Sequence, residues 1–485
     1  MLTNKEIIQF IDDDRLSEKK LHAKEGLDYY EGKHSILDYK LYYFNADGNL
    51  VEDKTRSNIK IPHPFFTEIV DQQVQYMLSG CDDGFVFSDE PELQQELDEY
   101  FNNNEDFIAE LNETLTGCIS KGFEYMYAYK NEEGKTSFQC ADSMGVIDVE
   151  AKYTSDNRNY MIYWYMERIN KEKEPVRRIQ VWDDNQTYYY TQVANKKIEL
   201  DESTPERPNP RPHVLYKKGN NDDTYYEGLG LIPFFRLDNN KKQFSGLMPI
   251  KSLIDDYDLQ NCSLSNNLQD LVEGIYVVKG FDGDNMDELI TNLKTKKLVG
   301  VGEGGDVDIK TVDIPYQARQ IKMDIDEKNI YKFGMGLNTS GLKDTAATTN
   351  IAIKSAYSLL DLKANKLEIK LKQFLRKILK VVLKEINDEN GTEYQQKDVY
   401  FKFEREVPTN AEENARIEEI SARTKQIEIN TLLGLASTLD DETIVQNICD
   451  VLDIDYEDIK NKLPKNEEII LNEVQNDLES VNVDE

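Results

Sequence analysis

The sequence is poor in the residues that build metal centres and disulfide frameworks. Its 485 residues include five cysteines and four histidines. The cysteines lie far apart, are odd in number and form no CxxC pair, so we expect free, buried thiols in a reducing compartment. The histidines are too scattered for a metal cluster, and we expect no cofactor.

Three further absences narrow the function. No run of about 18 apolar residues occurs, so no membrane-spanning segment is expected. The start, MLTNKEIIQFIDDD, lacks the basic and then apolar regions of a secretory signal. No GxxxxGK[ST] motif is present, which excludes a P-loop motor, and no local signature of a catalytic triad occurs. Residue spacing alone therefore does not indicate an enzyme.

Basic residues are outnumbered. The chain has 92 Asp and Glu against 58 Lys and Arg, a formal net charge of -34. Tight binding of free duplex DNA needs a basic footprint, so that class is disfavoured. An acidic protein can still contact DNA weakly if its role is to let the DNA slide past it. With 39% hydrophobic residues, the chain can build cores over two to four domain-sized units.

The periodicity of apolar residues gives the expected order of elements. Helices are predicted within residues 3–33, 64–80, 91–121, 247–272, 317–333, 349–386 and 409–485. Strands are predicted within residues 123–142, 158–168, 177–192, 228–239, 275–280, 296–314 and 398–405. Polar loops are predicted at residues 34–60, 200–227 and 334–350. In the helix over 64–80, Pro64 suits the first turn and Gly80 suits the C-terminal cap.

The tyrosines of the strands at 158–168 and 177–192 have two interpretations. Aromatic residues favour half-buried, pleated surfaces, which predicts strand packing. A stacking platform for single-stranded nucleic acid is the alternative, but it normally accompanies a basic groove, and Asp183 and Asp184 lie here instead.

The glycine-rich run GVGEGG (300–305) matches GxGxxG. A dinucleotide fingerprint requires a helix next. The following residues alternate as a strand does, so we predict a hairpin turn within a strand–turn–strand at 296–314.

Acidic residues cluster on the predicted helix at 247–272. Asp255 and Asp258 share a face and Asp256 does not. Such acids could hold catalytic metals, but no partner is marked, so we predict a solvated or lumen-facing stripe.

The long helix predicted at 349–386 is basic. An acidic surface of the same or an adjacent subunit is its expected partner, and DNA is the alternative. Its basic residues are Lys354, Lys363, Lys366, Lys370, Lys372, Arg376, Lys377, Lys380 and Lys384.

The order of these elements resembles the portal proteins of tailed double-stranded DNA bacteriophages, of the type found in long-tailed phages of Gram-positive hosts. The likeness covers roughly residues 5–460. It is carried by NIKIPHPFFTEIVDQQVQYMLSG (58–80), GLGLIPFFRLDNN (228–240), SGLMPIKSLIDDYDLQNCSLSNNLQDLVEGIYVVKG (245–280), KKLVGVGEGGDVDIKTVDIP (296–315) and GLNTSGLKDTAATTNIAIKSAYSLLDLKANK (336–366).

The resemblance implies an α+β, mainly helical subunit that assembles into a ring of about twelve copies. Its parts would be an α/β wing (1–245), a first stem helix (246–272), a small α/β clip (273–315), a second stem helix (316–334), a tunnel loop (335–350), a long wing helix with a closing strand (351–408), a helical crown (409–465) and an acidic tail (466–485).

The resemblance also implies three sets of site residues. The tunnel loop in the DNA channel would include Asn338, Thr339, Ser340, Lys343, Asp344, Thr345, Thr348 and Thr349. The acidic face of the stem would be Asp255, Asp256, Asp258 and Asp270. The clip would contact the motor or the adaptor through Lys296, Lys297, Glu303, Asp306 and Asp308.

The function implied is a non-enzymatic DNA channel at one capsid vertex. A separate terminase ATPase would package DNA through it, and head–tail adaptors would dock on it. Other expected partners are the large terminase subunit and the major capsid and scaffolding proteins, with assembly in the host cytoplasm and a final place in the virion. The alternatives are a structural ring or scaffold without DNA passage, and a metal-dependent nuclease that uses the Asp255 region.

Overall fold

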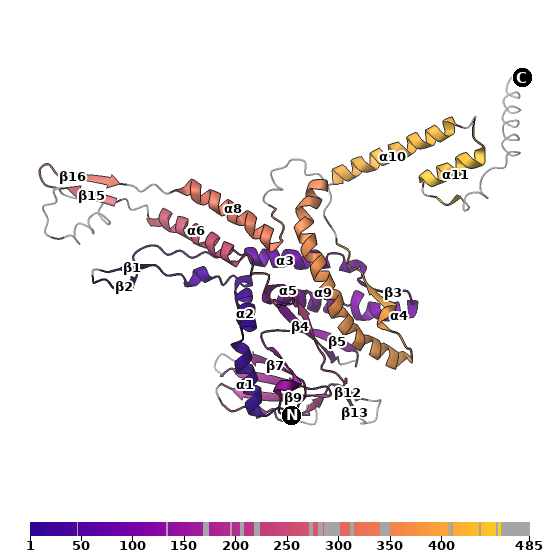
Figure 1. Cartoon of the computed structure of the whole chain (residues 1–485), viewed down its shortest axis with the longest axis horizontal. Coiled ribbons are helices and arrows are strands. Elements are labelled where there is room, and N and C mark those ends of the chain that lie inside the picture. The colour runs from indigo at the N-terminus through magenta and orange to yellow at the C-terminus, as the bar shows by residue number, and fades with distance from the viewer. Residues whose placement is uncertain are drawn as a thin grey trace, which may run out of the picture. The chain divides into compact units, whose positions relative to one another are not determined.

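The computed structural model has a mixed helix and strand architecture (Figure 1). The residues that it describes are 1–45, 47–131, 134–167, 174–194, 196–203, 208–217, 224–270, 275–279, 285, 301–310, 315–339, 350–405, 407, 411–435, 438–452 and 454–456. The chain divides into two compact units, Met1–Asp344 with Ala356–Glu406, and Thr345–Ser355 with Val407–Glu485.

The helices match most of the predicted segments. They are α1 (Asn4–Arg15), α2 (Glu18–Tyr30), α3 (Phe65–Leu78), α4 (Pro91–Leu97), α5 (Glu105–Lys121), α6 (Lys251–Asp270), α8 (Tyr316–Gly334), α9 (Asn350–Asn390), α10 (Ala411–Gly434) and α11 (Asp441–Leu452). The strands are β1 (Tyr42–Phe44), β2 (Leu50–Glu52), β3 (Val86–Ser88), β4 (Phe123–Lys130), β5 (Thr136–Ala141), β6 (Val146–Val149), β7 (Tyr160–Glu167), β8 (Val176–Trp182), β9 (Gln186–Val193), β10 (Glu199–Leu200), β11 (Arg211–Pro212), β12 (Val214–Lys217), β13 (Thr224–Glu227), β14 (Phe234–Asp238), β15 (Ile275–Lys279), β16 (Asp306–Lys310) and β17 (Val399–Phe401).

Two antiparallel sheets form the core of the first unit. One has the order β10-β9-β8-β7-β6, with β11 also paired to β9, and the other has the order β14-β4-β5. Ile7 and Ile11 of α1 pack on the first sheet together with Tyr160 and Tyr190. These two tyrosines are 1% and 2% exposed, so the packing interpretation is confirmed for them.

The long helix α9 buries the predicted apolar stripe. Every residue of the stripe is at most 4% exposed: Leu367, Leu371, Phe374, Leu375, Ile378, Leu379, Val382, Leu383 and Ile386. Spacing at i, i+3 and i+4 places these side chains on one face, which accounts for the helix.

Two expectations about local structure were wrong. The predicted loop at 34–60 contains the β1–β2 hairpin, and the loop at 200–227 contains the β12–β13 hairpin. Of the strand–turn–strand predicted at 296–314, the turn at Gly304 (φ 83°) and the second strand, β16, are present, and β16 pairs with β15. The first predicted strand lies mostly outside the described residues. Strand partners depend on tertiary register, which alternation in one segment cannot specify.

The prediction for Gly80 was also wrong. Ser79 occupies the cap of α3, and Gly80 has a φ of -103°, outside the left-handed region. A side chain at Gly80 would meet the carbonyl oxygen of Glu404 at 2.5 Å. Close approach of the backbone explains this glycine.

Candidate functional site at the paired helices

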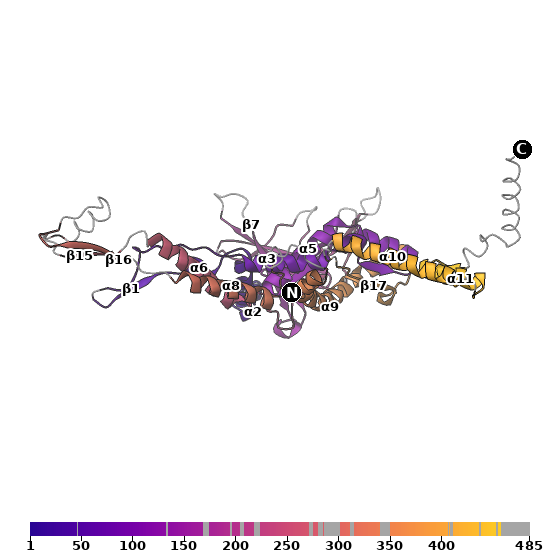
Figure 2. The same ribbon diagram turned by 90° about the horizontal axis from the view of Figure 1, so that it is seen from above.

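The helices α6 and α8 lie side by side, and α6 is tied to an extended segment, residues 57–63 (Figures 1 and 2). Alternate residues of the segment donate backbone N–H groups to every fourth side chain of the helix. The pairs are Ser57 with Asp270 (3.2 Å), Ile59 with Asn266 (2.6 Å), Ile61 with Cys262 Sγ (3.2 Å) and His63 with Asp258 (3.0 Å). Two extended residues advance about 6.6 Å and four helical residues about 6.0 Å, so the two repeats stay in step.

The four acceptor residues on α6, Asp258, Cys262, Asn266 and Asp270, form a row along the helix. Asp258 is the most buried member of this row. Its side chain has no exposed surface. One carboxylate oxygen lies 2.8 Å from Nδ1 of His63, and the other lies 2.6 Å from Nδ1 of His34. Tyr29 stacks on His34 with ring centroids 4.5 Å apart. The predicted solvated or lumen-facing stripe is therefore wrong for Asp258, because two histidines from the N-terminal part of the chain cover it.

Asp255 is also held by its own chain. It accepts hydrogen bonds from the hydroxyls of Tyr29 and Ser35 and from Nζ of Lys251 at 2.7 Å. Burial alone would raise the pKa of Asp255, but these bonds hold the pKa below its ordinary value. An ionised carboxylate with three donors has little capacity left for a metal ion.

Asp256 lies on another face of α6 and links it to α8. Lys322 of α8 bonds to both Asp256 and Asp326. The hydrogen bond from Lys322 lowers the pKa of Asp256. Because Asp256 and Lys322 are 37% and 44% exposed, this bridge lies at the surface.

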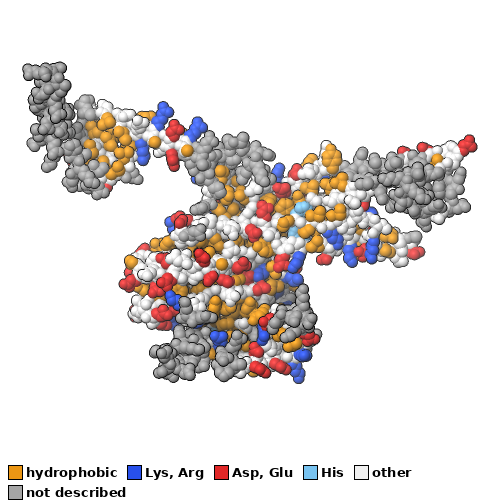
Figure 3. Space-filling view, turned by 180° about the vertical axis from the view of Figure 1, so that it is seen from behind, with side chains coloured by type: hydrophobic (Ala, Val, Ile, Leu, Met, Phe, Trp, Pro, Cys, Tyr) orange, Lys and Arg blue, Asp and Glu red, His pale blue; other side chains and the backbone are white. Residues whose placement is uncertain are grey.

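The helix α8 exposes four large apolar side chains, which lie among exposed polar and charged residues such as Lys328 and Lys332. Tyr316 is 61% exposed, Ile321 is 60%, and Ile325 and Phe333 are each 49%. Figure 3 shows hydrophobic side chains at the surface of the paired helices. The β1–β2 hairpin also exposes Tyr42, Tyr43, Phe44, Leu50 and Val51. Ile321 and Ile325 share one side of α8, and exposed apolar residues of this size are common at interfaces.

Two glutamines of α3 hold the chain where it leaves α8. Gln72 accepts from the backbone N–H of Leu337 at 2.8 Å and donates to its carbonyl at 3.0 Å. Gln73 donates to the carbonyl of Gly334 at 2.8 Å. The following loop therefore begins from a fixed point. Gln73 is a polar residue within an otherwise apolar helical stripe, and this position could have indicated a buried hydrogen-bonding role. No comparable sequence signal marks Gln72.

The predicted tunnel loop is only partly described. The Asn338 side chain donates to Glu327 at 3.2 Å, and Thr339 is exposed. The other predicted residues lie outside the described part of the chain: Ser340, Lys343, Asp344, Thr345, Thr348 and Thr349.

The predicted clip residues lie on or beside the β15–β16 hairpin. Glu303, Asp306 and Asp308 are exposed. Asp306 is the register partner of Lys279 on β15. Lys296 and Lys297 lie outside the described residues, as does the tail at 466–485.

The described residues show neither a metal centre nor a membrane span. Within them, no group of three or more His, Cys, Asp and Glu side chains could hold a metal ion, and no helix is long and apolar enough to cross a membrane.

Comparisons with known proteins agree on one family. The family of phage portal proteins, SPP1 Gp6-like, matches residues 9–461. The portal protein of Bacillus phage SPP1 is 28% identical over 354 residues, which are 73% of this chain and 67% of that protein. The portal protein of Clostridium phage phiCD119 is 25% identical over 375 residues, which are 72% of this chain and 79% of that protein.

A solved structure, the neck of a native GTA particle computed with C12 symmetry, is also similar. It has 12% sequence identity and a TM-score of 0.33, and the match covers 79% of this chain and 90% of that chain. This score does not establish a shared fold. The family match spans most of the chain, so the chain belongs to the SPP1 Gp6-like family of phage portal proteins.

Proposed function

We propose that this portal protein assembles into a ring of about twelve copies around a channel for double-stranded DNA. The observation that carries the proposal is the apolar surface of α8 and of the β1–β2 hairpin. Ile321 and Ile325 lie one helical turn apart and are both about half exposed or more. Apolar area of this kind is stabilised when a neighbouring copy covers it.

For the parts of the subunit, we propose the division that the family resemblance implies. Helix α6 lies within the first stem segment (246–272) and α8 is the second stem helix (316–334), with the clip (273–315) between them. Residues 1–245 form the outer wing, and residues 351–408 add its long helix and closing strand. Residues 335–350 form the tunnel loop, residues 409–465 the crown and residues 466–485 the tail.

The chemistry of the proposed channel favours sliding over binding. The chain that enters the proposed tunnel loop is fixed at Leu337 by Gln72. The net charge of -34 repels phosphates and keeps contacts with DNA weak. Energy for packaging comes from a separate terminase, which contacts the clip before the head–tail adaptor does.

A metal-dependent nuclease at Asp255 is the second candidate from the sequence. The three donors to this carboxylate argue against it. Incubation of duplex DNA with the protein and Mg²⁺ or Mn²⁺ should leave the DNA intact. Cleavage that is lost in Asp255→Ala would overturn the portal function.

The ring is tested by mass measurement and negative-stain imaging of the purified chain. We expect rings of about twelve copies with an open axial hole. A protein that stays monomeric or dimeric at all concentrations would contradict the proposal, and so would a closed disc without a hole, which is the outcome for a scaffold protein.

A further inference from the structure

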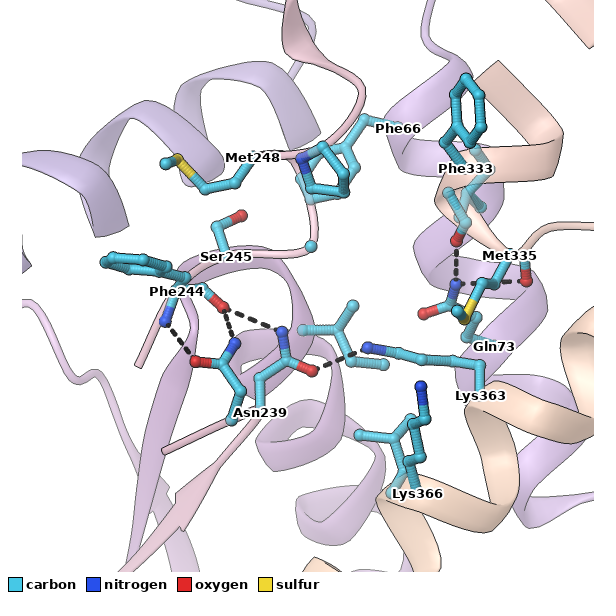
Figure 4. Close-up of a pocket in the computed structure, with 17 residues that line it drawn as sticks. Phe66, Gln73, Asn239, Phe244, Ser245, Met248, Phe333, Met335, Lys363 and Lys366 are labelled. Carbon is cyan, nitrogen blue, oxygen red and sulfur yellow. Dashed lines mark hydrogen bonds between the residues drawn. The ribbon is translucent and has the colours of Figure 1, made fainter. Parts of the chain in front are cut away.

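A cavity of about 340 Å³ lies where α3, α8, α9 and the segment after β14 meet (Figure 4). Its walls are mainly apolar. They include Phe66, Phe244, Met248, Phe333 and Met335. A volume in this range suits a small organic molecule.

Two lysines of α9 line this cavity. The Nζ of Lys363 donates to Oδ1 of Asn239 at 2.7 Å, and the amine of Lys366 lies beside it in Figure 4. Asn239 is itself oriented by a bond from its Nδ2 to the carbonyl of Phe244, 2.9 Å long. The amide that faces Lys363 is therefore neutral and fixed.

Negative charge is missing from this place in a strongly acidic chain. The residues that line the cavity include no Asp or Glu. Within the described part of the chain, no ion pair joins Lys363 or Lys366 to a carboxylate. Lys366 is exposed to solvent, but Lys363 is partly buried, and a buried cation is unfavourable unless an anion accompanies it.

The cavity also contains an unsatisfied neutral acceptor, on the side chain of Gln73. The Oε1 atom of Gln73 is buried and has no hydrogen-bond partner among the described residues. An acceptor in this position favours a ligand that also carries a hydroxyl or a protonated oxygen.

We propose that this cavity binds a small organic anion, with its phosphate or carboxylate group at Lys363 and Lys366 and its apolar body against the aromatic wall. This site is separate from the row of acceptors on α6. Because Gly334 and Met335 line the same cavity, a bound anion would also contact the end of α8.

Burial makes Lys363 measurable by chemical footprinting. Burial lowers the pKa of Lys363 to about 8. Near pH 7.5, such an amine has on the order of a hundredfold more neutral form than an ordinary lysine. Acetic anhydride then reports on it: the neutral amine attacks a carbonyl carbon, an amide forms, acetate leaves and the amine proton passes to buffer.

The experiment follows acetylation of Lys363 in the full chain by peptide mass spectrometry, with phenyl phosphate as the anionic probe. Saturating phenyl phosphate should slow modification of Lys363 about tenfold, because it blocks the amine and keeps it protonated. Benzyl alcohol, a neutral probe of similar shape, should not. Lys377, which is exposed on the same helix, should be modified equally under all conditions.

Two variants complete the test. Lys366→Met should weaken the protection of Lys363 by phenyl phosphate, and Lys377→Met should leave it unchanged. Equal protection by benzyl alcohol, or equal protection of Lys363 and Lys377, would overturn the proposal. Protection of Lys363 that rises with protein concentration and needs no phenyl phosphate would assign the pocket to a second copy of the chain, and would also overturn it.

Discussion

The two packed helices α6 and α8 differ in how their surfaces are covered. Helix α6 presents polar acceptors, and the same chain supplies donors for them from residues 57–63 and from His34. Helix α8 presents Ile321 and Ile325 to solvent. Hydrogen bonds are directional and are costly when unmade, whereas apolar contact is not directional. The polar groups of α6 in this row are therefore satisfied within the subunit, and we propose that a neighbouring copy covers Ile321 and Ile325.

Charges on the outer face of α8 should have the largest effect. The double variant Ile321→Asp with Ile325→Asp should abolish rings, because each interface would have to bury unpaired carboxylates. Mass measurement should find monomers whose circular dichroism matches that of the parent chain. Gln320→Asp adds a charge at an exposed position on another side of α8, about 100° or more around the helix from Ile321 and Ile325, and should leave rings intact. If the double variant still forms rings of normal size, this face of α8 is not part of the interface between copies.

The next largest effect is expected at the buried end of the row on α6. Asp258→Ala should lower the free energy of unfolding by about 3 kcal/mol, because His34 and His63 lose their shared acceptor. Urea unfolding measures the loss. Asp324→Ala, at an exposed position on α8, should change stability by less than about 0.5 kcal/mol. Similar losses in both variants would mean that the buried carboxylate has no special role.

A single bond in the middle of the row should have a smaller effect. Asn266→Ala removes the acceptor for the N–H of Ile59 and should cost about 1 kcal/mol. The amide of Ile59 should then exchange its hydrogen faster. Asn267→Ala alters the next residue and should leave that exchange rate unchanged. If both variants speed the exchange equally, the row does not depend on specific pairs.

The smallest effect is expected at the bridge between the helices. Asp256→Ala should cost less than about 1 kcal/mol, because the pair is exposed and Lys322 keeps Asp326. The pKa of Asp256 is lowered, so its contribution is present above the ordinary carboxylate pKa and is lost as the pH falls through the lowered value. Unfolding measured at neutral and acidic pH, with and without salt, checks both statements. A larger loss than for Asp258→Ala would reverse the ranking.

Elements with strong apolar periodicity were predicted correctly from the sequence. Features that depend on contacts between residues far apart in the chain were not. The stripe on α9 was predicted fully, because helical spacing alone determines which residues share a face. The burial of Asp258 was missed, because it depends on His34 and His63, which lie 224 and 195 residues away. The β1–β2 hairpin was missed because its strands have three residues each. Nothing in a polar segment indicates that its few aromatics pair as strands.

The candidate site was predicted unevenly for the same reason. The helix that became α6 was correctly placed by its apolar residues, and the helix that became α8 was placed at residues 317–333 and, through the family resemblance, at 316–334. The acidic residues were read from composition, which does not show whether a carboxylate faces water or a backbone N–H. The lysines of α9 were expected to meet acids; Lys372 does pair with Glu368 at 2.7 Å, but Lys363 faces Asn239.

The pairing of residues 57–63 with α6 limits which insertions and deletions the gene can tolerate. Donors alternate along the extended segment, so one added or lost residue would turn the remaining N–H groups away from the helix. A change of two residues in the segment would stay in phase only with a change of four in α6. Length variation among relatives should therefore be rare within 57–63 and within Asp258–Asp270, and common in the loops on either side.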